Sequence, residues 1–495
     1  MVSPILLIVV PLGLAFAVPL LERISKKLVG YVPVLAMAFN LVLSVVLLRR
    51  AVSEPIIVHT GSWQPPFSIH LVAGPLGLLL AALIALIGLG VAVYAMSTIR
   101  EGATRLYHVL YILLLTGATG IVLTGDLFNL FVFFEILCIS SYALVAYRGD
   151  RAGIESATKY LIQGAIGSSL ALIGIGILYG MFGTLSMADI AQHIHSVAPF
   201  GLFMALALLI TGFGVEAAIF PLNAWLPDAH SSAPSPISAI LSGIAIKVGI
   251  YAVARIIFTL YGLETVFLFV AVLGLLTLLI GEMSAFSQNN IKRLLAYSSI
   301  GQVGLILFAL GIASVTGVTG ALFLVVSHGL AKSVLFLSVG VMITRTGSAE
   351  ISSLDGMGKR MPLSALCFTI GAFSLIGLPP FVGFAAKFTV VRAVFEQTST
   401  LFTVLIGVAL LGTVVEAAYF FRIVQRLYFK PPPEGSLDHA GRGQEAPLSA
   451  LIPIGILTVV IIVAGVYPGL FSSFLEPAAT DLLDKAVYIR HVLGG

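Results

Sequence analysis

A glutamate lies inside an apolar stretch that is otherwise typical of a membrane-spanning helix. In residues 121–142, IVLTGDLFNLFVFFEILCISSY, Asp126 stands near the start and Glu135 follows nine residues later. On a helix this spacing separates the carboxylates by about 13 Å in height and about 180° in phase, so they cannot share one site. A carboxylate at the depth of Glu135 is costly unless it faces protein or water. We interpret Glu135 as part of an ion pathway; the alternative is a protonated glutamate that holds helices together.

A second acid, Glu216, precedes a proline-rich interruption in TGFGVEAAIFPLNAWLPDAH. It could cap the backbone amides that such an interruption leaves free. The functional hypothesis is that Glu216 faces Glu135 and accepts a proton or a cation, because two nearby carboxyl groups do not titrate together. Asp228, in the same segment, is a secondary candidate.

Basic residues occur in the apolar stretches that follow. Lys247 is followed at i+4 and i+8 by Tyr251 and Arg255, which places all three on one helix face. His328 and Lys332 are likewise one turn apart. A buried lysine loses its charge readily and histidine switches charge near neutral pH, so both residue types can relay protons. Arg255, near a helix end, is expected to extend its side chain to the membrane surface.

Two further ionisable residues complete the set. Lys387 follows the proline pair in GLPPFVGFAAKF, and Glu416 lies in a later apolar stretch. Lys159 begins another stretch and is secondary, because its side chain could extend to the membrane surface. The residues predict a lateral hydrated proton path with two half-channels. That path comprises Glu135, Glu216, Lys247, His328, Lys332, Lys387 and Glu416, with Lys159, Tyr251 and Asp228 as secondary members.

The sequence offers little for other kinds of chemistry. The remaining histidines do not form spaced pairs on facing spans, so haem ligation is not expected. Cys138 and Cys367 lie in apolar stretches, which argues against a disulfide framework or a cysteine metal site. No phosphate-binding loop and no nucleophile–base arrangement stands out. We predict no catalytic residue, no metal and no cofactor.

Composition places the chain in a membrane. Hydrophobic residues make up 59% and charged residues 10%, and the mean hydropathy is +1.10, as in integral membrane proteins with many spans. A net charge of +4 on 495 residues is too small to indicate binding to nucleic acid. The N-terminal stretch has no basic residue before its apolar core, so we interpret it as a first membrane helix and not as a cleaved signal peptide.

The apolar stretches predict an all-α integral membrane protein with about fourteen transmembrane helices, the seventh and twelfth broken at prolines. The stretches lie near 4–21, 28–48, 71–95, 106–123, 127–147, 157–182, 199–220, 237–260, 264–285, 294–313, 316–344, 363–396, 401–428 and 449–471. Loop charges that include Arg100, Arg148 and Arg442 gather on one side, which places both termini outside the cell membrane. The weakly amphipathic tail, 472–493, is expected on the outer surface or against a partner.

Internal repetition organises the chain. QGAIGSSLALIGIG (163–176) aligns without a gap with SHGLAKSVLFLSVG (327–340). Five helices per unit is an odd number, so two successive units must cross the membrane in opposite directions, as in secondary transporters. We predict four regions: helices 1–3 in residues 1–105, a first repeat in 106–260, a second repeat in 261–428, and a polar loop, last helix and tail in 429–495.

Several motifs resemble the antiporter-like subunits of Mrp-type cation/proton antiporters, over about residues 60–430. They are GDLFNLFVFFEI, FPLNAWLPDAHSSAPSPISAILSG, NNIKRLLAYSSIGQVG, SHGLAKSVLF and GLPPFVGFAAKF. The nearest branch resembles the MrpD type, found also in membrane-bound hydrogenase and sulfane reductase complexes, and the same family supplies proton-pumping subunits to respiratory complex I. The resemblance implies fourteen helices in two inverted repeats. It also implies that Glu135, Lys247, His328, Lys332 and Lys387 match the family's positions on helices 5, 8, 11 and 12.

The chain departs from this family at three positions. Glu216 stands where the family usually has lysine, and Asn223 where it often has histidine. An aspartate that is common after the loop between helices 2 and 3 is replaced around Gly74. The usual glutamate–lysine pair of the first half-channel would therefore be Glu135 and Glu216, which leaves open whether this half carries protons or binds a cation.

We predict a proton- or Na⁺/H⁺-translocating subunit of a multisubunit membrane complex. A partner's redox reaction or an opposing ion gradient would supply the energy. Its partners would be other membrane subunits, these ions and lipid, and not nucleic acid. The alternatives are a non-translocating structural subunit, a stand-alone permease for a small solute, and a quinone-reducing enzyme, although no motif supplies a redox donor.

Overall fold

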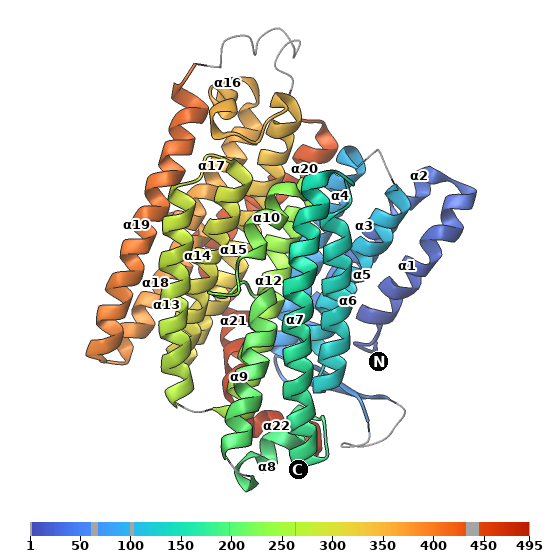
Figure 1. The fold of residues 1–495 in the computed structure, drawn as a ribbon, viewed down its shortest axis with the longest axis vertical. Coiled ribbons are helices and arrows are strands. Elements are labelled where there is room, and N and C mark those ends of the chain that lie inside the picture. Colours follow the sequence, from blue (N-terminus) through green and yellow to red (C-terminus); the bar gives the residue numbers. More distant parts are fainter. Residues whose placement is uncertain are drawn as a thin grey trace.

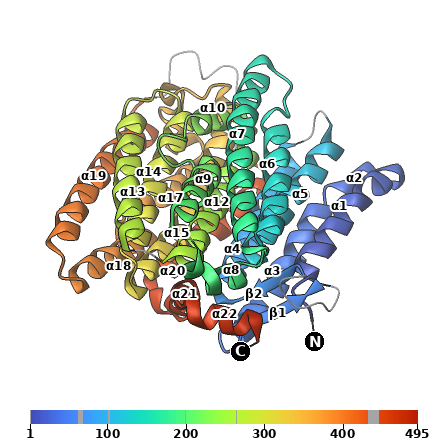
Figure 2. The same ribbon diagram turned by 60° about the horizontal axis from the view of Figure 1, so that its bottom comes forward.

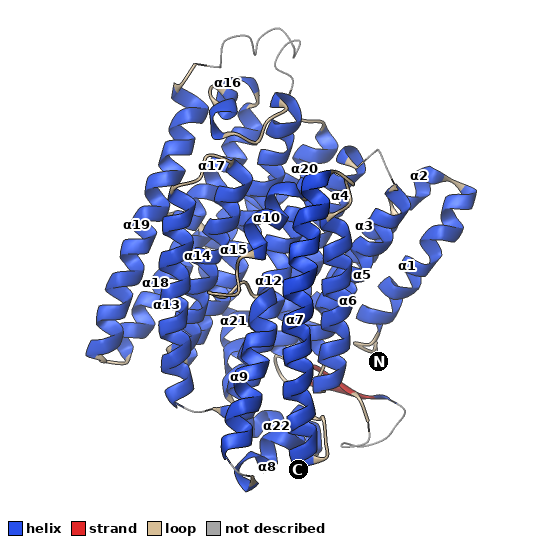
Figure 3. Cartoon of the chain, in the orientation of Figure 1, coloured by secondary structure: helices blue, strands red, loops and turns tan. Residues whose placement is uncertain are grey.

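The computed structural model describes residues 2–60, 68–99, 103–197, 199–262, 264–431 and 445–494. Arg100, Arg442 and most of the predicted polar loop lie outside these ranges. The structure therefore does not test the part of the orientation argument that uses these residues. The chain is largely helical (Figure 3). Among the described residues, thirteen helical segments are long and apolar enough to cross a membrane.

These thirteen segments account for most of the predicted spans. They are α1 (Leu6–Ile24), α3 (Val32–Ala51), α4 (Pro75–Thr98), α5 (Thr104–Leu123), α6 (Leu127–Val145), α7 (Arg151–Phe182), α9 (Pro199–Glu216), the continuous run Ser235–Tyr261, α13 (Glu264–Phe286), α14 (Ile291–Gly311), α15 (Val315–Thr346), α19 (Thr400–Phe429) and α20 (Leu448–Val466). The chain is therefore a helical membrane protein, and in its described ranges the strands form one short hairpin. In this hairpin β1 (Ile56–His59) pairs antiparallel with β2 (His70–Ala73).

Two apolar segments are interrupted at the prolines that the sequence singles out. Helix α9 ends at Glu216, and residues 217–224 separate it from the next helix, α10 (Trp225–Ser232). Helix α17 (Pro362–Ile376) ends at Gly377, whose φ of +92° favours glycine, and α18 (Val382–Glu396) follows the Pro379–Pro380 pair. Interruptions of this kind leave backbone groups free of helical hydrogen bonds, so side chains of the surrounding helices must satisfy them.

The same local structures recur at residue numbers that differ by 164. Asp126 caps α6 by accepting from the Asn129 amide, and Asn290 caps α14 by accepting from two amides. Asp150 and Ser314 cap α7 and α15, two helices of 32 residues each. An antiparallel bridge joins Asp126 to Ser186, and a second one joins Asn290 to Glu350. The caps and bridges therefore occur in the same order and with the same spacing in two long stretches of the chain.

The centre of the molecule is built from the helices that carry buried charge. The run Ser235–Tyr261 and the most apolar stretch of α15 are entirely buried, and α14 is almost entirely buried, whereas α1 and α19 lie at opposite edges (Figure 1). The run consists of α11 (Ser235–Ile240), a π-helical segment η3 (Leu241–Ala245), α12 (Ile246–Arg255) and a second π-helical segment η4 (Ile256–Tyr261). Such π segments inside helices are often found at functional sites.

Short helices complete the chain at the ends of the bundle. They are α2 (Lys26–Val29), α8 (Met187–His193), η2 (Ile194–Ser196), η5 (Ile351–Leu354), α16 (Met357–Arg360), α21 (Pro468–Leu483) and α22 (Lys485–Leu493). The tail formed by α21 and α22 packs on this chain itself, with α21 against α4 and α15 and α22 against α8 (Figure 2). One face of α21, formed by Leu475, Ala478, Ala479 and Leu482, is buried against this chain, and the location of the tail on the outer surface or against a partner stays a prediction.

Candidate functional site: a buried row of charged residues

Glu216 ends α9 in a pocket of hydrogen-bond donors. Its side chain is 1% exposed, and the Tyr160 hydroxyl of α7 donates to Oε1 at 2.7 Å and Oε2 at 2.9 Å. The Cys138 thiol of α6 approaches Oε2 at 3.5 Å. A buried carboxylate needs donors of this kind. The oxygens of Glu216 accept from the side chains of Tyr160 and Cys138. The alternative that Glu216 caps free backbone amides at the interruption is therefore not supported.

Aromatic packing fixes the tyrosine that holds Glu216. The rings of Tyr160 and Trp225 stack at 3.8 Å with an angle of 3°, and the Trp225 indole donates to the Val215 carbonyl at 2.8 Å. Trp225 therefore ties the start of α10 to the end of α9 across the interruption. A tyrosine with its ring clamped in this way can present its hydroxyl in only one direction.

Glu135 lies one turn before Cys138 on α6. It is half-buried, and its Oε1 has no hydrogen-bond partner among the described residues. Its charge acts on Glu216 and on Cys138, so the two acids share one electrostatic environment. Cys138, one turn after Glu135 on α6, contacts Glu216, so the end of α9 packs against the helix that carries Glu135.

Helix α12 approaches this pair closely. A Cβ built on Gly249 would lie 2.6 Å from the Ala217 amide nitrogen and 3.0 Å from the Glu216 carbonyl carbon, so only glycine fits there. Lys247, two residues earlier, is 3% exposed and donates to the Ser242 carbonyl of η3. The Ser242 hydroxyl bonds to Ser299 of α14 at 2.8 Å. Gly249 therefore brings one face of α12 against the end of α9, whereas Lys247 lies about 200° around the helix and lines a small cavity with Leu80 and Leu83 of α4.

The row of charged residues comprises Glu135, Glu216, Lys247, Lys332, Lys387 and Glu416. Lys332 is the most deeply buried of them. It is 0% exposed and donates to the Leu295 carbonyl at 2.9 Å. In the described part of the chain neither Lys332 nor Lys247 has a carboxylate as a hydrogen-bond partner. The charge of Lys332 acts on Lys247 on one side and on Glu282 and Glu416 on the other. Lys332 also lies 5.9 Å from the ring centre of Phe420, one turn after Glu416 on α19.

Two buried histidines accompany the lysines. His328 lies one turn before Lys332, and His230 of α10 stacks on Phe336 at 4.8 Å. Both ring nitrogens of each histidine lack a hydrogen-bond partner among the residues that the structure describes. His328 interacts electrostatically with Lys247, Lys332 and His230. Buried polar nitrogens without protein partners are typically satisfied by water, so this part of the row can be hydrated.

The far half of the row contains an ion pair. Lys387 of α18 donates to Glu416 Oε2 at 2.9 Å and to the Ile376 carbonyl at 3.1 Å, where α17 ends. Gln302 of α14 donates to both oxygens of Glu416, at 2.8 and 2.9 Å. Lys387 thus satisfies a carbonyl that the end of α17 leaves free, as well as a buried carboxylate.

Sequence reasoning missed several members of this row. Glu282 of α13 is 1% exposed, and the Tyr419 hydroxyl of α19 donates to its Oε2 at 2.7 Å. Its position inside the apolar stretch 264–285 is the signal that could have identified it. The other residues that were missed are Tyr160, His230, Gln302 and Tyr419. Tyrosine and glutamine carry no formal charge, so an analysis of buried charges passes over them.

The remaining predicted residues lie outside the row. Lys159 is 53% exposed and pairs with Glu155 at 2.8 Å and with Asp228 at 3.1 Å. Asp228 also pairs with Arg293 at 2.9 Å. Tyr251 donates to the Val122 carbonyl at 3.1 Å. Lys159 and Asp228 therefore form a network at the end of the bundle and not in its interior.

The expectation that Arg255 extends to the membrane surface is wrong. Its side chain is 3% exposed and meets the Asp481 carboxylate of α21 at 3.6 Å. The physical reason is that the tail covers this end of α12, which the sequence alone did not reveal. A buried guanidinium is satisfied there by an anion instead of by water.

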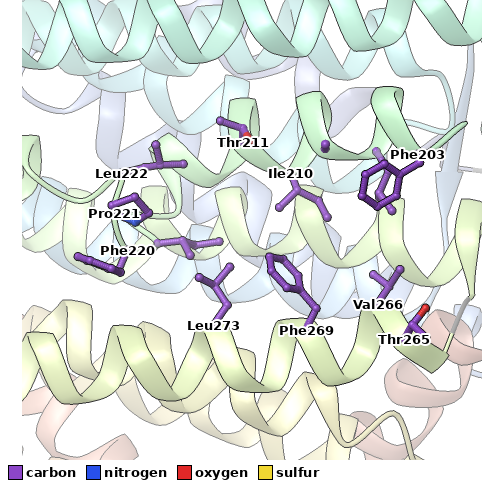
Figure 4. A pocket seen from close by; sticks show the side chains of 13 residues that line it. Phe203, Ile210, Thr211, Phe220, Pro221, Leu222, Thr265, Val266, Phe269 and Leu273 are labelled. Atoms are coloured by element: carbon purple, nitrogen blue, oxygen red, sulfur yellow. The ribbon is translucent and has the colours of Figure 1, made fainter. Parts of the chain in front are cut away.

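A distinct apolar cavity lies between α9 and α13. Figure 4 shows Phe203, Ile210 and Phe269 along it, with Pro221 and Leu222 at its end beside the interruption of α9. All thirteen lining residues are uncharged, and none belongs to the predicted pathway. Ligand sites usually combine apolar walls with a few converging polar groups, so this cavity does not resemble a site for a polar solute.

Comparison with known proteins identifies the family of this chain. The family model described as NADH:quinone oxidoreductase/Mrp antiporter, TM matches residues 124–412. NADH-quinone oxidoreductase subunit N of Desulforudis audaxviator is 36% identical, covering 94% of this chain and 95% of that protein. A Na(+)/H(+) antiporter subunit of Bacillus subtilis is 31% identical, covering 92% of each. A chain of the archaeal membrane-bound sulfane sulfur reductase superposes with a TM-score of 0.92 at 36% identity, covering 99% of each chain.

The matched region contains Glu135, Glu216, Lys247, Lys332 and Lys387. The resemblance to antiporter-like subunits is therefore confirmed, and the chain belongs to the NADH:quinone oxidoreductase/Mrp antiporter transmembrane family.

Proposed function

We propose that this chain is a proton- or Na⁺/H⁺-translocating subunit of a multisubunit membrane complex. The observation that carries the proposal is the burial of Lys332, which is 0% exposed and interacts electrostatically with Lys247 and with the acids Glu282 and Glu416. Groups of this kind inside a membrane are expensive and typically mark ion pathways. Relatives named as subunits of Na(+)/H(+) antiporters and of NADH-quinone oxidoreductase support this assignment.

The proposed architecture has fourteen spans, in which α17 and α18 together form the twelfth and α9 and α10 the seventh. Residues 106–260 and 261–428 would be two inverted five-helix repeats, between an N-terminal region (1–105) and a C-terminal region (429–495). The caps and bridges that recur with a separation of 164 residues support the repeats. In such folds ion sites lie beside broken helices near the membrane centre.

The proposed pathway runs laterally from Glu135 and Glu216 through Lys247, then Lys332 with His328, to Glu416 and Lys387. Each member is on a different helix, except His328 and Lys332, which share α15. A proton that arrives on Lys332 would create a charge that Glu416 and Glu282 stabilise, so protons would move by small local steps. The histidine nitrogens without protein partners support a hydrated stretch between the two lysines.

A polar hollow offers a route into this row from one end of the bundle. It is lined by Tyr94, Thr98, Ile99, Tyr147, Arg148, Pro234, Ser235, Pro236, Gly340 and Thr344. Ser235 begins α11, the segment that leads to Lys247, and Gly340 lies two turns after Lys332 on α15. We assign this hollow as the entrance of the half-channel that serves Lys247 and Lys332.

Other membrane subunits would be the partners, with H⁺ or Na⁺ as the ion and lipid around the bundle. A partner's redox reaction or an opposing ion gradient would drive transport. The chain would lie in the cell membrane with both termini outside. Figure 1 shows both chain ends in the lower half of the view, which is compatible with an even number of spans.

The test uses the intact complex reconstituted in liposomes. We expect Lys247→Ala and Glu135→Ala to abolish ion translocation while the complex still assembles on native gels. Lys159→Ala is the matched control, because this lysine is exposed, and it should transport normally. If Lys247→Ala translocates at the normal rate, the pathway is wrong. If Gln or Met in these positions disrupts assembly but leaves transport per assembled complex unchanged, the chain is a structural subunit.

A further inference from the structure

Asp481 of α21 fills a space that a side chain on residue 74 would otherwise occupy. A Cβ built on Gly74 would lie 2.8 Å from Asp481 Oδ2 and 3.2 Å from its Cγ. Gly74 is the N-cap residue of α4 and has no side chain with which to cap the helix. Asp481 Oδ2 instead accepts from the Leu76 amide at 3.2 Å, across 405 residues of sequence. The C-terminal tail therefore supplies the cap that α4 lacks.

The same carboxylate is the counter-ion of Arg255. Arg255 Nη2 lies 3.6 Å from Asp481 Oδ2, and the side chains are 3% and 9% exposed. The guanidinium also lies over the ring of Tyr488 in α22, at 5.0 Å from its centre. A buried cation requires an anion close by, and removal of that anion leaves an uncompensated charge. Both α21 and α22 therefore hold Arg255 in place.

Arg255 lies on the helix that carries Lys247. It ends α12, two turns after Lys247, and its Nε meets the Tyr251 hydroxyl at 3.3 Å. Tyr251 in turn donates to the Val122 carbonyl at the end of α5. Helix α12 lies between two π-helical segments, and these contacts anchor its last turn to α5 and to the tail. The Asp481 carboxylate is therefore linked through Arg255 and α12 to Lys247.

We propose that Asp481 is a positioning residue for ion translocation. It caps α4 and neutralises Arg255, and thereby fixes the helix that presents Lys247 to the buried row. The C-terminal tail is thus part of the working structure of the pathway. The translocation part of this inference rests on the proposed function, whereas the docking of the tail through Asp481 does not.

Four variants in the intact complex test the inference. Asp481→Asn keeps an oxygen that can accept from the Leu76 amide but removes the charge opposite Arg255. Asp481→Ala removes both. Gly74→Asp combined with Asp481→Ala moves the carboxylate onto α4, where the clash with Asp481 no longer exists. Glu476→Gln is the control, because Glu476 is an exposed carboxylate on the same helix.

Two readouts separate positioning from mere stability: the ion translocation rate per assembled complex, and cleavage of the tail by an added protease. We expect Asp481→Ala to slow translocation at least tenfold and to expose the tail. Asp481→Asn should slow translocation with much less cleavage. Gly74→Asp in the Asp481→Ala background should restore at least half of the wild-type rate, and Glu476→Gln should match the wild type.

The inference is overturned if Asp481→Ala translocates normally with a protected tail, or if the relocated carboxylate does not restore translocation. If the wild-type complex does not translocate ions at all, the proposed function fails. The protease readout on Asp481→Ala then still decides whether Asp481 holds the tail in place.

Discussion

Removing Lys387 should destabilise the protein far more than removing Lys387 and the charge of Glu416 together. In the Lys387→Met variant the Glu416 carboxylate, which is 1% exposed, keeps only Gln302 as a polar partner among the described residues. The double variant Lys387→Met/Glu416→Gln removes both charges of the pair. No member of the pair is then a buried charge without a counter-ion. The free energy of unfolding should therefore fall sharply in the single variant and recover in the double one.

The magnitude follows from the 2.9 Å contact between Lys387 Nζ and Glu416 Oε2. At an effective dielectric constant of about 20, two unit charges at that separation attract by about 6 kcal/mol, before the cost of removing both from water. Breaking one side of a buried pair costs about 3–5 kcal/mol, whereas neutral replacement of both partners is often nearly neutral. We expect a loss of about 3–5 kcal/mol in the single variant and about 1 kcal/mol in the double variant.

The assay is reversible unfolding of the purified protein in mixed detergent micelles, followed by the fluorescence of tryptophan, since Trp225 is buried. The single variants and the double variant form a double-mutant cycle, which isolates the coupling energy of the pair. Additive effects, with a coupling energy below about 0.5 kcal/mol, would refute the reasoning that the pair is an interacting buried unit.

Three further predictions concern single residues. Glu216→Gln keeps an oxygen that can accept from Tyr160 and should leave the fold intact, but ion translocation by the complex should fall at least tenfold; an unchanged rate would contradict a role for the acid. Asp228→Asn breaks only surface pairs and should change the free energy of unfolding by less than about 1 kcal/mol, with normal transport; a loss above about 3 kcal/mol would contradict this. His70, outside the spans, has its pKa lowered by burial to about 4. The unfolded state therefore binds a proton that the folded state does not, and stability should fall by about 3 kcal/mol as the pH decreases from about 6.5 to about 4. His70→Asn should remove that part of the pH dependence, and equal slopes for both proteins in a pH series of unfolding curves would contradict it.

The charged residues of the site could be predicted because they occur in stretches of sequence that are otherwise apolar. Lysines and glutamates inside apolar stretches stand out by type alone, and Lys247, Lys332 and Glu416 are each buried in the structure. The interruptions after Glu216 and Ile376 were equally visible, since proline cannot continue a helix. Predictions of this kind need only the local sequence and the nature of the membrane interior.

What the sequence did not reveal depends on how distant helices meet. Tyr160 and Tyr419 look like ordinary aromatic residues until packing turns their hydroxyls toward Glu216 and Glu282. Arg255 looks like a residue near a helix end that can reach water, and only the fold of the tail shows that Asp481 covers it. Helical periodicity predicts which face of a helix a residue occupies, but not which residue of another helix it contacts. These pairings depend on such contacts between helices.

The two carboxylates at the ends of the row have unlike surroundings, and this difference bears on the mechanism. Glu216 has two donors that are themselves uncharged, Tyr160 and Cys138, and the charge that acts on it is a second acid, Glu135. Glu416 has a cation, Lys387, at 2.9 Å. A proton or cation is therefore better accommodated at the Glu135–Glu216 end, where it reduces repulsion, than at the far end, where the charge is already balanced. On the proposed pathway, we expect an ion gained at the Glu135–Glu216 end to change the charge balance along the row, and this asymmetry would give the row a direction in which charge can be passed.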